Sequence, residues 1–442
     1  MYLIFFFHDR EEYKSTVNYI AMGIFSLANE LQKNKFKTEI IHLGIEKALN
    51  LDFDIAKHIK DNKIKIIGIS LNWHYQAYDA LNVAQHIKIN CPDCFIFLGG
   101  LTCSAFADEI LKKYPYIDAI IKGEGEKPVV ELVTNIINDN YNLSYIPNLY
   151  WKDKNGKIHK NKKTWFANEQ ELNEYKFDNL KLLKNYDLYL KMTLIYNKVT
   201  NKPDIVYFRN PKNIFCCLGR GCLGNCTWCG GGYNAIKEIT GRDTISIRDP
   251  KIVAQEILHL KQEYDIETFS LCYDPCPPKQ DFAIDLFNIL GKEMPKKINL
   301  SFECFGLPNK EFIDSFKQNL EPNSVIVISP DFGDEKTRQV HKSFYYSNEE
   351  LLKCLDYIKN KDIKTHLYFA RTDFEKEYQT LSFIDTYIKD NYNNVSCFIN
   401  AIKDIEPYSP WAINPEKYNC PYNKKLDFEY FYRASKAYRD FI

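Results

Sequence analysis

The chain has 442 residues, of which 45% are hydrophobic, 26% charged and 15% aromatic. This composition is typical of a globular protein, and the length predicts about two to three domains. Lys and Arg together number 58, as do Asp and Glu, so the formal net charge is zero. A neutral chain has no overall attraction for nucleic acid or for an anionic membrane, and we expect neither as a main partner.

The apolar run Tyr2–Phe7 stops at His8-Asp9-Arg10 and is too short for the core of a signal peptide. We find no apolar run near the roughly 20 residues that a membrane-spanning helix needs. We therefore expect a cytoplasmic protein, in which most of the 14 cysteines are reduced.

Residues 1–140 alternate between strand-like runs and amphipathic segments such as Tyr19–Gln32 and Tyr78–Ile89. This alternation predicts an α/β domain with a Rossmann-like, doubly wound parallel sheet, whose ligand lies at the carboxyl ends of the strands. The predicted strands are Tyr2–Phe7, Thr38–Leu43, Ile64–Leu71, Cys94–Leu98 and Ala119–Ile121.

The loops at these strand ends contain the candidate ligand-binding residues of the first domain. Paired glycines after a strand let a large flat ligand approach the backbone closely. No GxGxxG follows the first strand, which argues against a dinucleotide site. The candidates are Ser70, Leu71, Gly99, Gly100, Gly123, Glu124 and Gly125.

Two further features of this domain are open to more than one interpretation. His74 is either a metal ligand or a surface histidine. Cys91 and Cys94 form a CxxC that is a redox pair, a metal clip or a turn with two incidental thiols.

Residues 141–205 are predicted to be a connector between domains. Ile146–Trp151, followed by Lys154–Lys157, indicates a short hairpin. Residues 175–196 are rich in Tyr, Leu and Lys but show no clean periodicity.

Residues 206–410 alternate again and predict six βα units, as in a partial (β/α)6 TIM-type barrel with its active site at the carboxyl ends of the strands. Asp249-Pro250 begins one helix and Ser347 with Glu350 forms a capping box for another. Residues 411–442 are predicted to form a C-terminal helical extension. The predicted strands are Asn213–Cys217, Thr268–Cys272, Ile298–Cys304, Ser324–Ser329, Lys364–Ala370 and Val395–Ala401.

The first strand of this series leads into the loop GRGCLGNCTWCGGG, which places Cys222, Cys226 and Cys229 close together. Three thiolates at this spacing can hold three corners of a [4Fe–4S] cluster and leave the fourth iron open. Structural zinc normally needs four ligands, and a disulfide framework needs an oxidising compartment. We therefore favour the cluster over zinc and over disulfides.

The CxxxCxxC pattern, with Trp228 directly before the last cysteine, resembles the signature of radical S-adenosylmethionine (SAM) enzymes. In that family the open iron binds SAM, and an electron from the cluster cleaves SAM to methionine and a 5′-deoxyadenosyl radical. The three cysteines would thus be catalytic and also the metal ligands.

The strand-end loops of residues 1–140 resemble those of the cobalamin-binding domain that precedes the radical domain in cobalamin-dependent radical SAM enzymes. The likeness is strongest in GGLTCSAFADEIL, residues 99–111, and in YIDAIIKGEGEKPVVEL, residues 116–132. It covers most of residues 1–410. The loop HDREEYKST lacks the Asp-x-His-x-x-Gly motif of methionine synthase, so the resemblance implies base-off cobalamin without a bond from His8.

The resemblance places SAM across the strand ends of the second domain. Many relatives have Gly-Gly-Glu after the second strand, where this chain has Leu271-Cys272-Tyr273-Asp274-Pro275. The alternative interpretation is that the polar residues at these strand ends are only solvated at the rim of the domain and do not bind SAM. Cys216, Cys217, Cys272 and Cys276 leave a second cluster open as a less favoured interpretation. The candidates for SAM are Asp274, Glu303, Ser329 and Arg371, with Asp331 as a further one.

The resemblance implies an enzyme that methylates an unactivated carbon of a natural product or peptide by way of methylcobalamin. The alternatives are radical cyclisation or rearrangement without methyl transfer, and a non-catalytic cobalamin or redox sensor. The implied cofactors are a [4Fe–4S] cluster, SAM and cobalamin. The implied partners are a small-molecule or peptide substrate and an external electron donor such as flavodoxin or ferredoxin.

Overall fold

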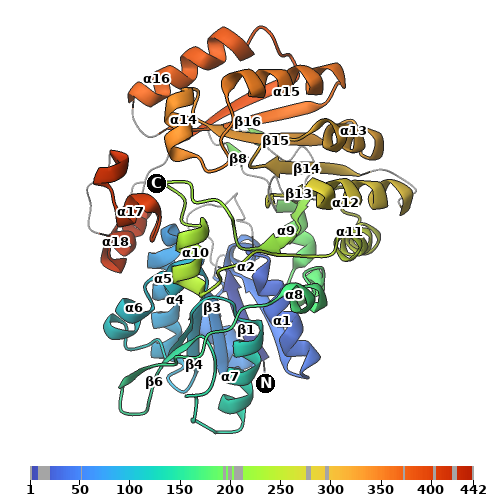
Figure 1. Ribbon diagram of the computed structural model, residues 1–442. Coiled ribbons are helices and arrows are strands. Elements are labelled where there is room, and N and C mark those ends of the chain that lie inside the picture. Colours follow the sequence, from blue (N-terminus) through green and yellow to red (C-terminus); the bar gives the residue numbers. More distant parts are fainter. Residues whose placement is uncertain are drawn as a thin grey trace. The chain divides into compact units, whose positions relative to one another are not determined.

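A computed structural model describes residues 2–7, 20–50, 52–192, 196–197, 202–203, 213–274, 280–293, 298–371, 374–401, 405–420 and 426–440. The chain divides into two units (Figure 1). The first comprises Met1–Pro211, Glu238–Gly241 and Lys425–Ile442, and the second comprises Lys212–Lys237 and Arg242–Lys424. None of the described helices combines the length and the apolar character that crossing a membrane requires.

The first unit is built on a seven-stranded sheet in the order β2-β1-β3-β4-β5-β6-β7. The first five strands are parallel, as predicted, because helical crossovers return the chain to the same edge. They are β1 (Tyr2–Phe7), β2 (Lys37–His42), β3 (Ile66–Ser70), β4 (Phe95–Gly99) and β5 (Ala119–Ile121). The predicted hairpin forms β6 (Leu149–Lys152) and β7 (Ile158–Lys160), which extend the sheet in antiparallel fashion.

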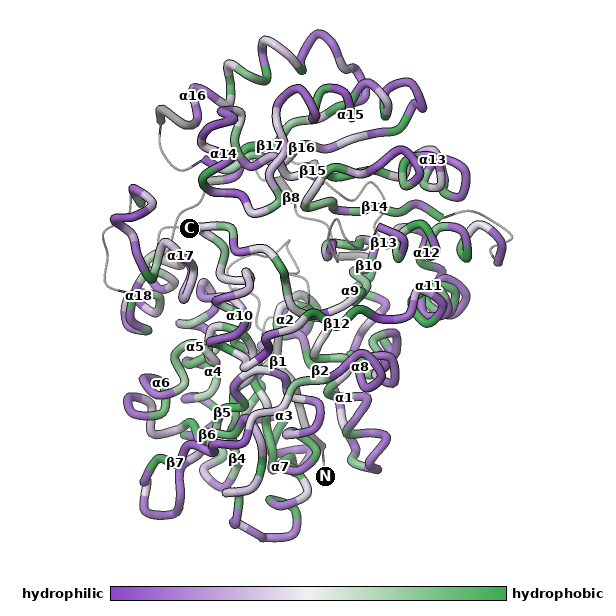
Figure 2. The backbone as a smooth tube through the Cα atoms, viewed as in Figure 1, coloured by the Kyte–Doolittle hydropathy of each residue, from purple (hydrophilic) through white to green (hydrophobic). Residues whose placement is uncertain are grey.

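Helices surround this sheet because its strands are hydrophobic, as β4 and β5 show (Figure 2). Helices α1 and α7 contact each other, and α18 contacts α4. The helices are α1 (Gly23–Lys33), α2 (Leu43–Leu49), α3 (Ile55–Asp61), α4 (Ala77–Asn90), α5 (Leu101–Ala105), α6 (Ala107–Lys113), α7 (Glu126–Ile137), α8 (Glu169–Glu174), α9 (Tyr186–Met192) and α18 (Phe428–Asp440), with short helices η1 (His74–Gln76) and η2 (Leu180–Leu182). A two-stranded sheet joins β8 (Tyr196–Asn197) and β9 (Lys202–Pro203).

Helix α18 belongs to the core of the first unit. Phe428 and Phe431 are buried in the hydrophobic cluster that also contains Phe106, and their rings lie 5.8 and 5.4 Å from the Phe106 ring. The segment predicted as a C-terminal extension, residues 411–442, is therefore divided between the units. The segment predicted as a connector, residues 141–205, is grouped with the first unit.

The second unit contains a six-stranded parallel sheet in the order β10-β13-β14-β15-β16-β17. This agrees with the predicted series of βα units. The strands are β10 (Asn213–Phe215), β13 (Thr268–Leu271), β14 (Asn299–Cys304), β15 (Val325–Asp331), β16 (Lys364–Arg371) and β17 (Val395–Ala401). A two-stranded antiparallel pair, β11 (Gly219–Arg220) and β12 (Ser246–Ile247), lies beside the cysteine loop in the sequence.

Two helices of this part begin where the sequence predicted. Asp249 caps α11 by accepting from the Lys251 amide, and Ser347 and Glu350 form the capping box of α15. The helices are α10 (Tyr233–Thr240), α11 (Pro250–Tyr264), α12 (Gln280–Glu293), α13 (Lys310–Asn319), α14 (Glu335–His341), α15 (Asn348–Asn360), α16 (Phe374–Phe383) and α17 (Pro410–Ile413), with short helices η4 (Ile384–Ile388) and η5 (Glu416–Tyr418). The last residues of α10, from Glu238, are grouped with the first unit.

Candidate functional site

The cysteine loop leaves the sheet of the second unit after β10 and begins at β11. Gly221 has a φ of +90°, and a Cβ at this position would lie 2.6 Å from the Thr244 carbonyl oxygen. Only glycine fits this backbone conformation and this close approach. The turn at Gly221 therefore fixes where Cys222 leaves the β11–β12 pair.

Each of the three predicted cluster ligands accepts a hydrogen bond from a backbone amide. The sulfur of Cys222 accepts from Gly224 N at 3.3 Å, and that of Cys229 accepts from Gly231 N at 3.3 Å. The sulfur of Cys226 accepts from Ser343 N at 3.4 Å. Amide donors stabilise negative charge on sulfur, so this arrangement suits thiolates that bind iron.

Burial acts against the thiolate form of these residues when no iron is bound. It raises the pKa of Cys222, and it raises the pKa of Cys229 to about 12, with Cys226 as a smaller contribution. Binding of iron must therefore displace protons from these sulfurs. Within the described ranges, no three His, Cys, Asp or Glu side chains are arranged around a single metal ion. Ligands of a cluster bind different irons, so they do not have to converge on one point.

The last residue of α14 and the two residues after it hold the cysteine loop. The amide of Thr227 donates to the His341 carbonyl at 3.0 Å, and the Thr227 hydroxyl lies 2.8 Å from His341 Nδ1. Ser343 Oγ accepts from the Asn225 amide at 2.6 Å. We call residues 341–343 the loop clamp, because they bind three consecutive loop residues, Asn225 through Thr227.

The aromatic residue of the motif also contributes to holding the loop. The Trp228 ring packs edge-on against the Phe332 ring at 5.4 Å and against the Trp411 ring at 6.3 Å. The Trp411 amide donates to the Thr227 carbonyl at 2.9 Å. The loop is therefore fixed by packing as well as by hydrogen bonds.

Two of the predicted SAM-binding residues contact each other on neighbouring strands. Ser329 Oγ, on β15, donates to Glu303 Oε1, on β14, at 3.2 Å. Burial raises the pKa of Glu303 to about 7, and Asp331 adds to the rise. The buried Lys342 binds Asp331 at 3.0 Å. Half-buried carboxylates of this kind, at the carboxyl ends of parallel strands, suit a cationic ligand.

The other two predicted SAM-binding residues have protein partners. Asp274 Oδ2 accepts from the Phe305 amide at 2.6 Å, and its charge contributes to the raised pKa of Glu303 and of Cys222. Arg371 ends β16 and pairs with Glu377 at 3.3 Å. Asp274 thus belongs to the group around Glu303, whereas the contact that the structure gives Arg371 is with α16.

The cysteines considered for a second cluster do not form a group among the described residues. Cys216 is buried, Cys217 is half-buried and donates to the Gly219 carbonyl at 3.8 Å, and Cys272 is exposed. Cys276 lies outside the described residues.

The candidate residues of the first unit gather at the carboxyl ends of the adjacent strands β3, β4 and β5. Ser70 ends β3 and Gly99 ends β4. Gly100 has a φ of +112°, and a Cβ there would lie 2.8 Å from backbone atoms of Leu71 and Asn72. This close packing joins the loops that follow β3 and β4, with the Leu71 amide donating to the Gly99 carbonyl at 2.8 Å.

The loop after β5 is anchored in the same way. Gly123 has a φ of +94° and donates from its amide to Ser104 Oγ at 2.9 Å. The Glu124 carboxylate accepts from the Ala167 amide at 3.1 Å, and Gly125 precedes helix α7. At this edge of the sheet the glycines leave the backbone uncovered by side chains, and the Ser104 hydroxyl holds one of the loops in place. Such an edge is compatible with a large flat ligand.

Other features of the first unit have structural partners. His74 lies in η1, and its ring packs against the Phe431 ring at 5.1 Å. The thiols of Cys91 and Cys94 are buried and donate to the carbonyls of Ala56 and Ile64 at 3.6 and 3.3 Å. These contacts agree with incidental thiols in a turn. The loop at His8 lies outside the described residues.

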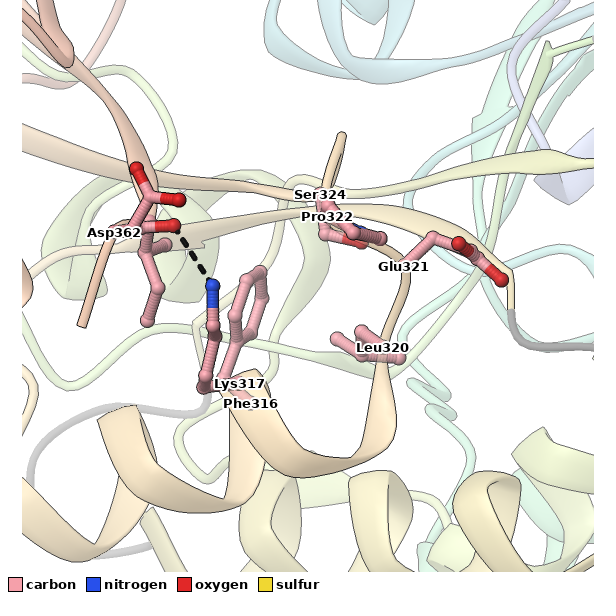
Figure 3. Close-up of a pocket in the computed structure, with 8 residues that line it drawn as sticks. Phe316, Lys317, Leu320, Glu321, Pro322, Ser324 and Asp362 are labelled. Atoms are coloured by element: carbon pink, nitrogen blue, oxygen red, sulfur yellow. Dashed lines mark hydrogen bonds between the residues drawn. The ribbon is translucent and has the colours of Figure 1, made fainter.

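A cavity of about 180 Å³ lies elsewhere in the second unit (Figure 3). It is close to the amino ends of β15 and β16, and Lys317 Nζ donates to the Asp362 carbonyl there at 3.0 Å. The cysteine loop and Glu303 belong to the carboxyl edge of the sheet, so this cavity is separate from the candidate site. Its lining residues are Phe316, Lys317, Leu320, Glu321, Pro322, Ser324, Asp362 and Ile363.

The loop clamp, which includes Lys342, was not predicted from the sequence. His341 ends α14, and Lys342 and Ser343 follow it, in a stretch without a recognisable motif more than 100 residues after the cysteines. No spacing rule connects such distant residues. Only the fold shows that they contact the loop.

Comparisons with known proteins agree with this division. Residues 14–133 match the family model of the B12 binding domain, and residues 217–381 match that of the radical SAM superfamily. An uncharacterized methyltransferase of Pyrococcus horikoshii is 34% identical over 107 residues, which is 24% of this chain and 22% of that protein. The region of similarity therefore spans less than a quarter of the length of this curated relative.

Two solved structures share the fold. TsrM from Kitasatospora setae, a radical SAM methyltransferase with cobalamin and a [4Fe–4S] cluster bound, has a TM-score of 0.67 and 13% identity, with 92% of this chain and 73% of TsrM covered. OxsB, a cobalamin-dependent radical SAM enzyme with aqua-cobalamin and SAM bound, has a TM-score of 0.64 and 15% identity, with 94% of this chain and 55% of OxsB covered. The cofactors of the two matched domains are cobalamin for the first and SAM with a [4Fe–4S] cluster for the second. The chain therefore combines a B12-binding domain with a radical SAM domain, in that order, and shares its fold with two solved cobalamin-dependent radical SAM enzymes.

Proposed function

We propose that this enzyme methylates an unactivated carbon of a natural product or peptide. The observation that carries the proposal is the cysteine loop, in which all three sulfurs of the CxxxCxxC motif accept amide hydrogen bonds in a chain that also contains a B12-binding domain. The methyltransferases among the similar proteins support methylation. A small molecule or a short peptide is the proposed substrate.

The chain's own residues would bind the cofactors and position them. When bound, the cluster supplies the electron that cleaves SAM, and cobalamin carries the methyl group. Cys222, Cys226 and Cys229 would each hold one iron and leave the fourth iron open for SAM. The loop clamp and Trp228 would keep the three sulfurs in place.

The half-buried carboxylates at the strand ends would bind the positive charge of SAM. Glu303, oriented by Ser329, and Asp274, oriented by the Phe305 amide, are the proposed ligands for its ammonium or ribose groups. Arg371 would bind a carboxylate after leaving Glu377. The glycine-rich edge formed by Ser70, Leu71, Gly99, Gly100 and Gly123 to Gly125 would support the corrin ring of cobalamin.

The first experiment is an anaerobic purification with cobalamin, followed by reconstitution with iron and sulfide. We expect a reducible [4Fe–4S] signal in electron paramagnetic resonance spectra, and absorption bands of base-off cobalamin. Replacement of Cys222, Cys226 and Cys229 by Ala should remove the cluster signal and leave the cobalamin bands. A preparation that takes up zinc in place of iron would overturn the proposal.

Product mass then tests the reaction. A gain of one methylene group in the mass of the product supports methylation. A product without this gain supports the cyclase or rearrangement alternative. In this assay, flavodoxin or ferredoxin should be able to take the place of the chemical reductant dithionite as the electron donor. Absence of reductant-dependent SAM cleavage in the fully loaded protein would leave the sensor alternative.

A further inference from the structure

An ion pair joins the end of β15 to the middle of the loop clamp. Lys342 Nζ donates to Asp331 Oδ2 at 3.0 Å, and the two side chains are only 3% and 16% exposed. Asp331 is the last residue of β15, and Lys342 is the central residue of the loop clamp. A pair so well shielded from water depends on both partners, because either charge left alone there would be poorly solvated.

The backbone at Asp331 departs from regular strand geometry. Asp331 has a φ of +66°, and the register between β15 and β16 shifts between Ile328 and Asp331. A bulge of this kind changes the direction of the side chain that follows it. A left-handed backbone conformation is uncommon outside glycine and persists where the surrounding structure holds it. The irregular end of β15 thus coincides with the residue that binds Lys342.

Arg338 holds the backbone of both partners of the ion pair. Its buried guanidinium donates to the carbonyls of Pro330 at 3.2 Å and Phe332 at 3.1 Å, on either side of Asp331. The Arg338 carbonyl accepts from the Lys342 amide at 2.9 Å. The ion pair is therefore one contact in a network that connects the end of β15 with the loop clamp.

Lys342 lies between the two loop-clamp residues whose backbone binds the cysteine loop. The His341 carbonyl accepts from the Thr227 amide at 3.0 Å, and the Ser343 amide donates to the Cys226 sulfur at 3.4 Å. Because Lys342 stands between these residues in the chain, anchoring its ammonium group constrains the backbone on both sides. A backbone tied in this way to a strand of the sheet can hold the Ser343 amide close to the Cys226 sulfur.

We propose that Asp331 and Lys342 are positioning residues, whose ion pair ties the loop clamp to the end of β15 and keeps the Ser343 amide directed at the Cys226 sulfur. The proposal rests on the proposed function, because it treats Cys226 as a ligand of the cluster. Hydrogen bonds to the sulfurs help to set the reduction potential of an iron–sulfur cluster. The pair should therefore act on the cluster through Ser343. The proposal also assigns Asp331, a further sequence candidate for SAM, to the support of the cysteine loop.

The test is a variant that removes both charges together, Asp331→Asn with Lys342→Met. Its net charge equals that of the unaltered chain and it leaves no buried charge unpaired, so the melting temperature should change little. The full chain is reconstituted with iron and sulfide, without SAM. We expect a lower midpoint potential in a redox titration followed by electron paramagnetic resonance, because a weakened amide hydrogen bond stabilises the reduced cluster less.

The rate of iron loss to a chelator is the second measurement on this variant. We expect it to rise about tenfold, at the low end of the effects of residues that orient metal ligands. An unchanged potential together with an unchanged rate of iron loss would overturn the proposal. If SAM binding alone were weakened, Asp331 or Lys342 would be a SAM ligand and the positioning role would likewise be refuted.

The single variant Asp331→Asn covers the case in which the double variant does not fold. It leaves Lys342 without its counter-charge, so its melting temperature should fall. The unpaired charge itself affects the potential, so this variant is judged by iron loss alone, which we again expect to be about tenfold faster. Iron loss at the rate of the unaltered chain would refute the proposal.

The matched control is Glu46→Gln with Lys184→Met in the first unit. Lys184 Nζ lies 2.7 Å from Glu46 Oε2, and the Glu46 side chain is only 5% exposed. Removing this pair should leave the cluster potential and the rate of iron loss unchanged. Equal changes in the two double variants would contradict a specific role for Asp331 and Lys342. If the unaltered chain itself takes up no cluster, the proposed function fails, which is distinct from failure of this inference.

Discussion

The imidazole Nδ1 of His341 lies 2.8 Å from the hydroxyl of Thr227. In the sequence, Thr227 lies between two predicted iron ligands, Cys226 and Cys229. The backbone of the same two residues is joined by a 3.0 Å hydrogen bond from the Thr227 amide to the His341 carbonyl. Two bonds between residues 114 positions apart hold the loop at its centre. The retention of the cluster should therefore depend on a residue far outside the motif.

Thr227→Val removes the hydroxyl and keeps the shape of the side chain. We expect the variant to lose iron about fivefold faster under a chelator, because one hydrogen bond contributes about 1 kcal/mol. The measurement is the decay of cluster absorbance. Thr365→Val is the control, because Thr365 is also buried and its hydroxyl has no partner among the described residues. Equal decay rates in the two variants would contradict a role for the loop clamp.

Gly99→Ala tests the predicted cobalamin edge. No atom lies within 4 Å of a Cβ at this position, so the fold should be unaffected and the melting temperature unchanged. If the corrin ring lies against this edge, the added methyl group should weaken cobalamin binding about tenfold, as overpacking does. Binding is followed by titration of the cobalamin absorbance. Gly23→Ala, which also has no atom within 4 Å, should leave both quantities unchanged.

Glu303 should make the stability of the cofactor-free protein depend on pH. Its pKa is raised from 4.5 to about 7 by burial, so the folded state favours the protonated form. The stabilising contribution of Glu303 to the free energy of unfolding is then fully present below about pH 4.5. It is lost as the pH rises through about 7, and this loss is about 3 kcal/mol at most. Denaturant midpoints between pH 5 and pH 8 measure this loss. Glu303→Gln should flatten the dependence, and a variant with the same slope as the unaltered chain would contradict it.

The buried ion pair behind the cysteine loop should matter more for stability than ion pairs on the surface. Arg248 donates to Glu256 at 2.6 and 2.8 Å and to the Cys217 carbonyl at 2.9 Å. Glu256→Gln leaves the buried guanidinium without its counter-charge, so we expect a loss of about 3–5 kcal/mol in the free energy of unfolding.

The surface pair of Glu349 and Lys353 provides the comparison for that loss. Their side chains are 76% and 71% exposed, so Glu349→Gln should change the free energy of unfolding by less than about 1 kcal/mol. Chemical denaturation measures both variants. Similar losses in both would show that burial of the Arg248 pair has no special effect.

The sequence by itself determined the strands and the order of the domains. Period and composition predicted the five parallel strands of the first unit and the six of the second, because buried parallel strands are continuous hydrophobic runs between helical segments. The spacing of Cys222, Cys226 and Cys229 indicated the cluster loop for a local reason, since three ligands within eight residues need only a short turn.

Only the tertiary structure decided what surrounds that loop. The contacts of the loop clamp with the cysteine loop join residues more than 100 positions apart, and no local pattern encodes them. Helix α18 is a similar case. A C-terminal helix was predicted from the sequence, but its place in the core of the first unit is set by aromatic packing of Phe428 and Phe431 against residues more than 300 positions earlier.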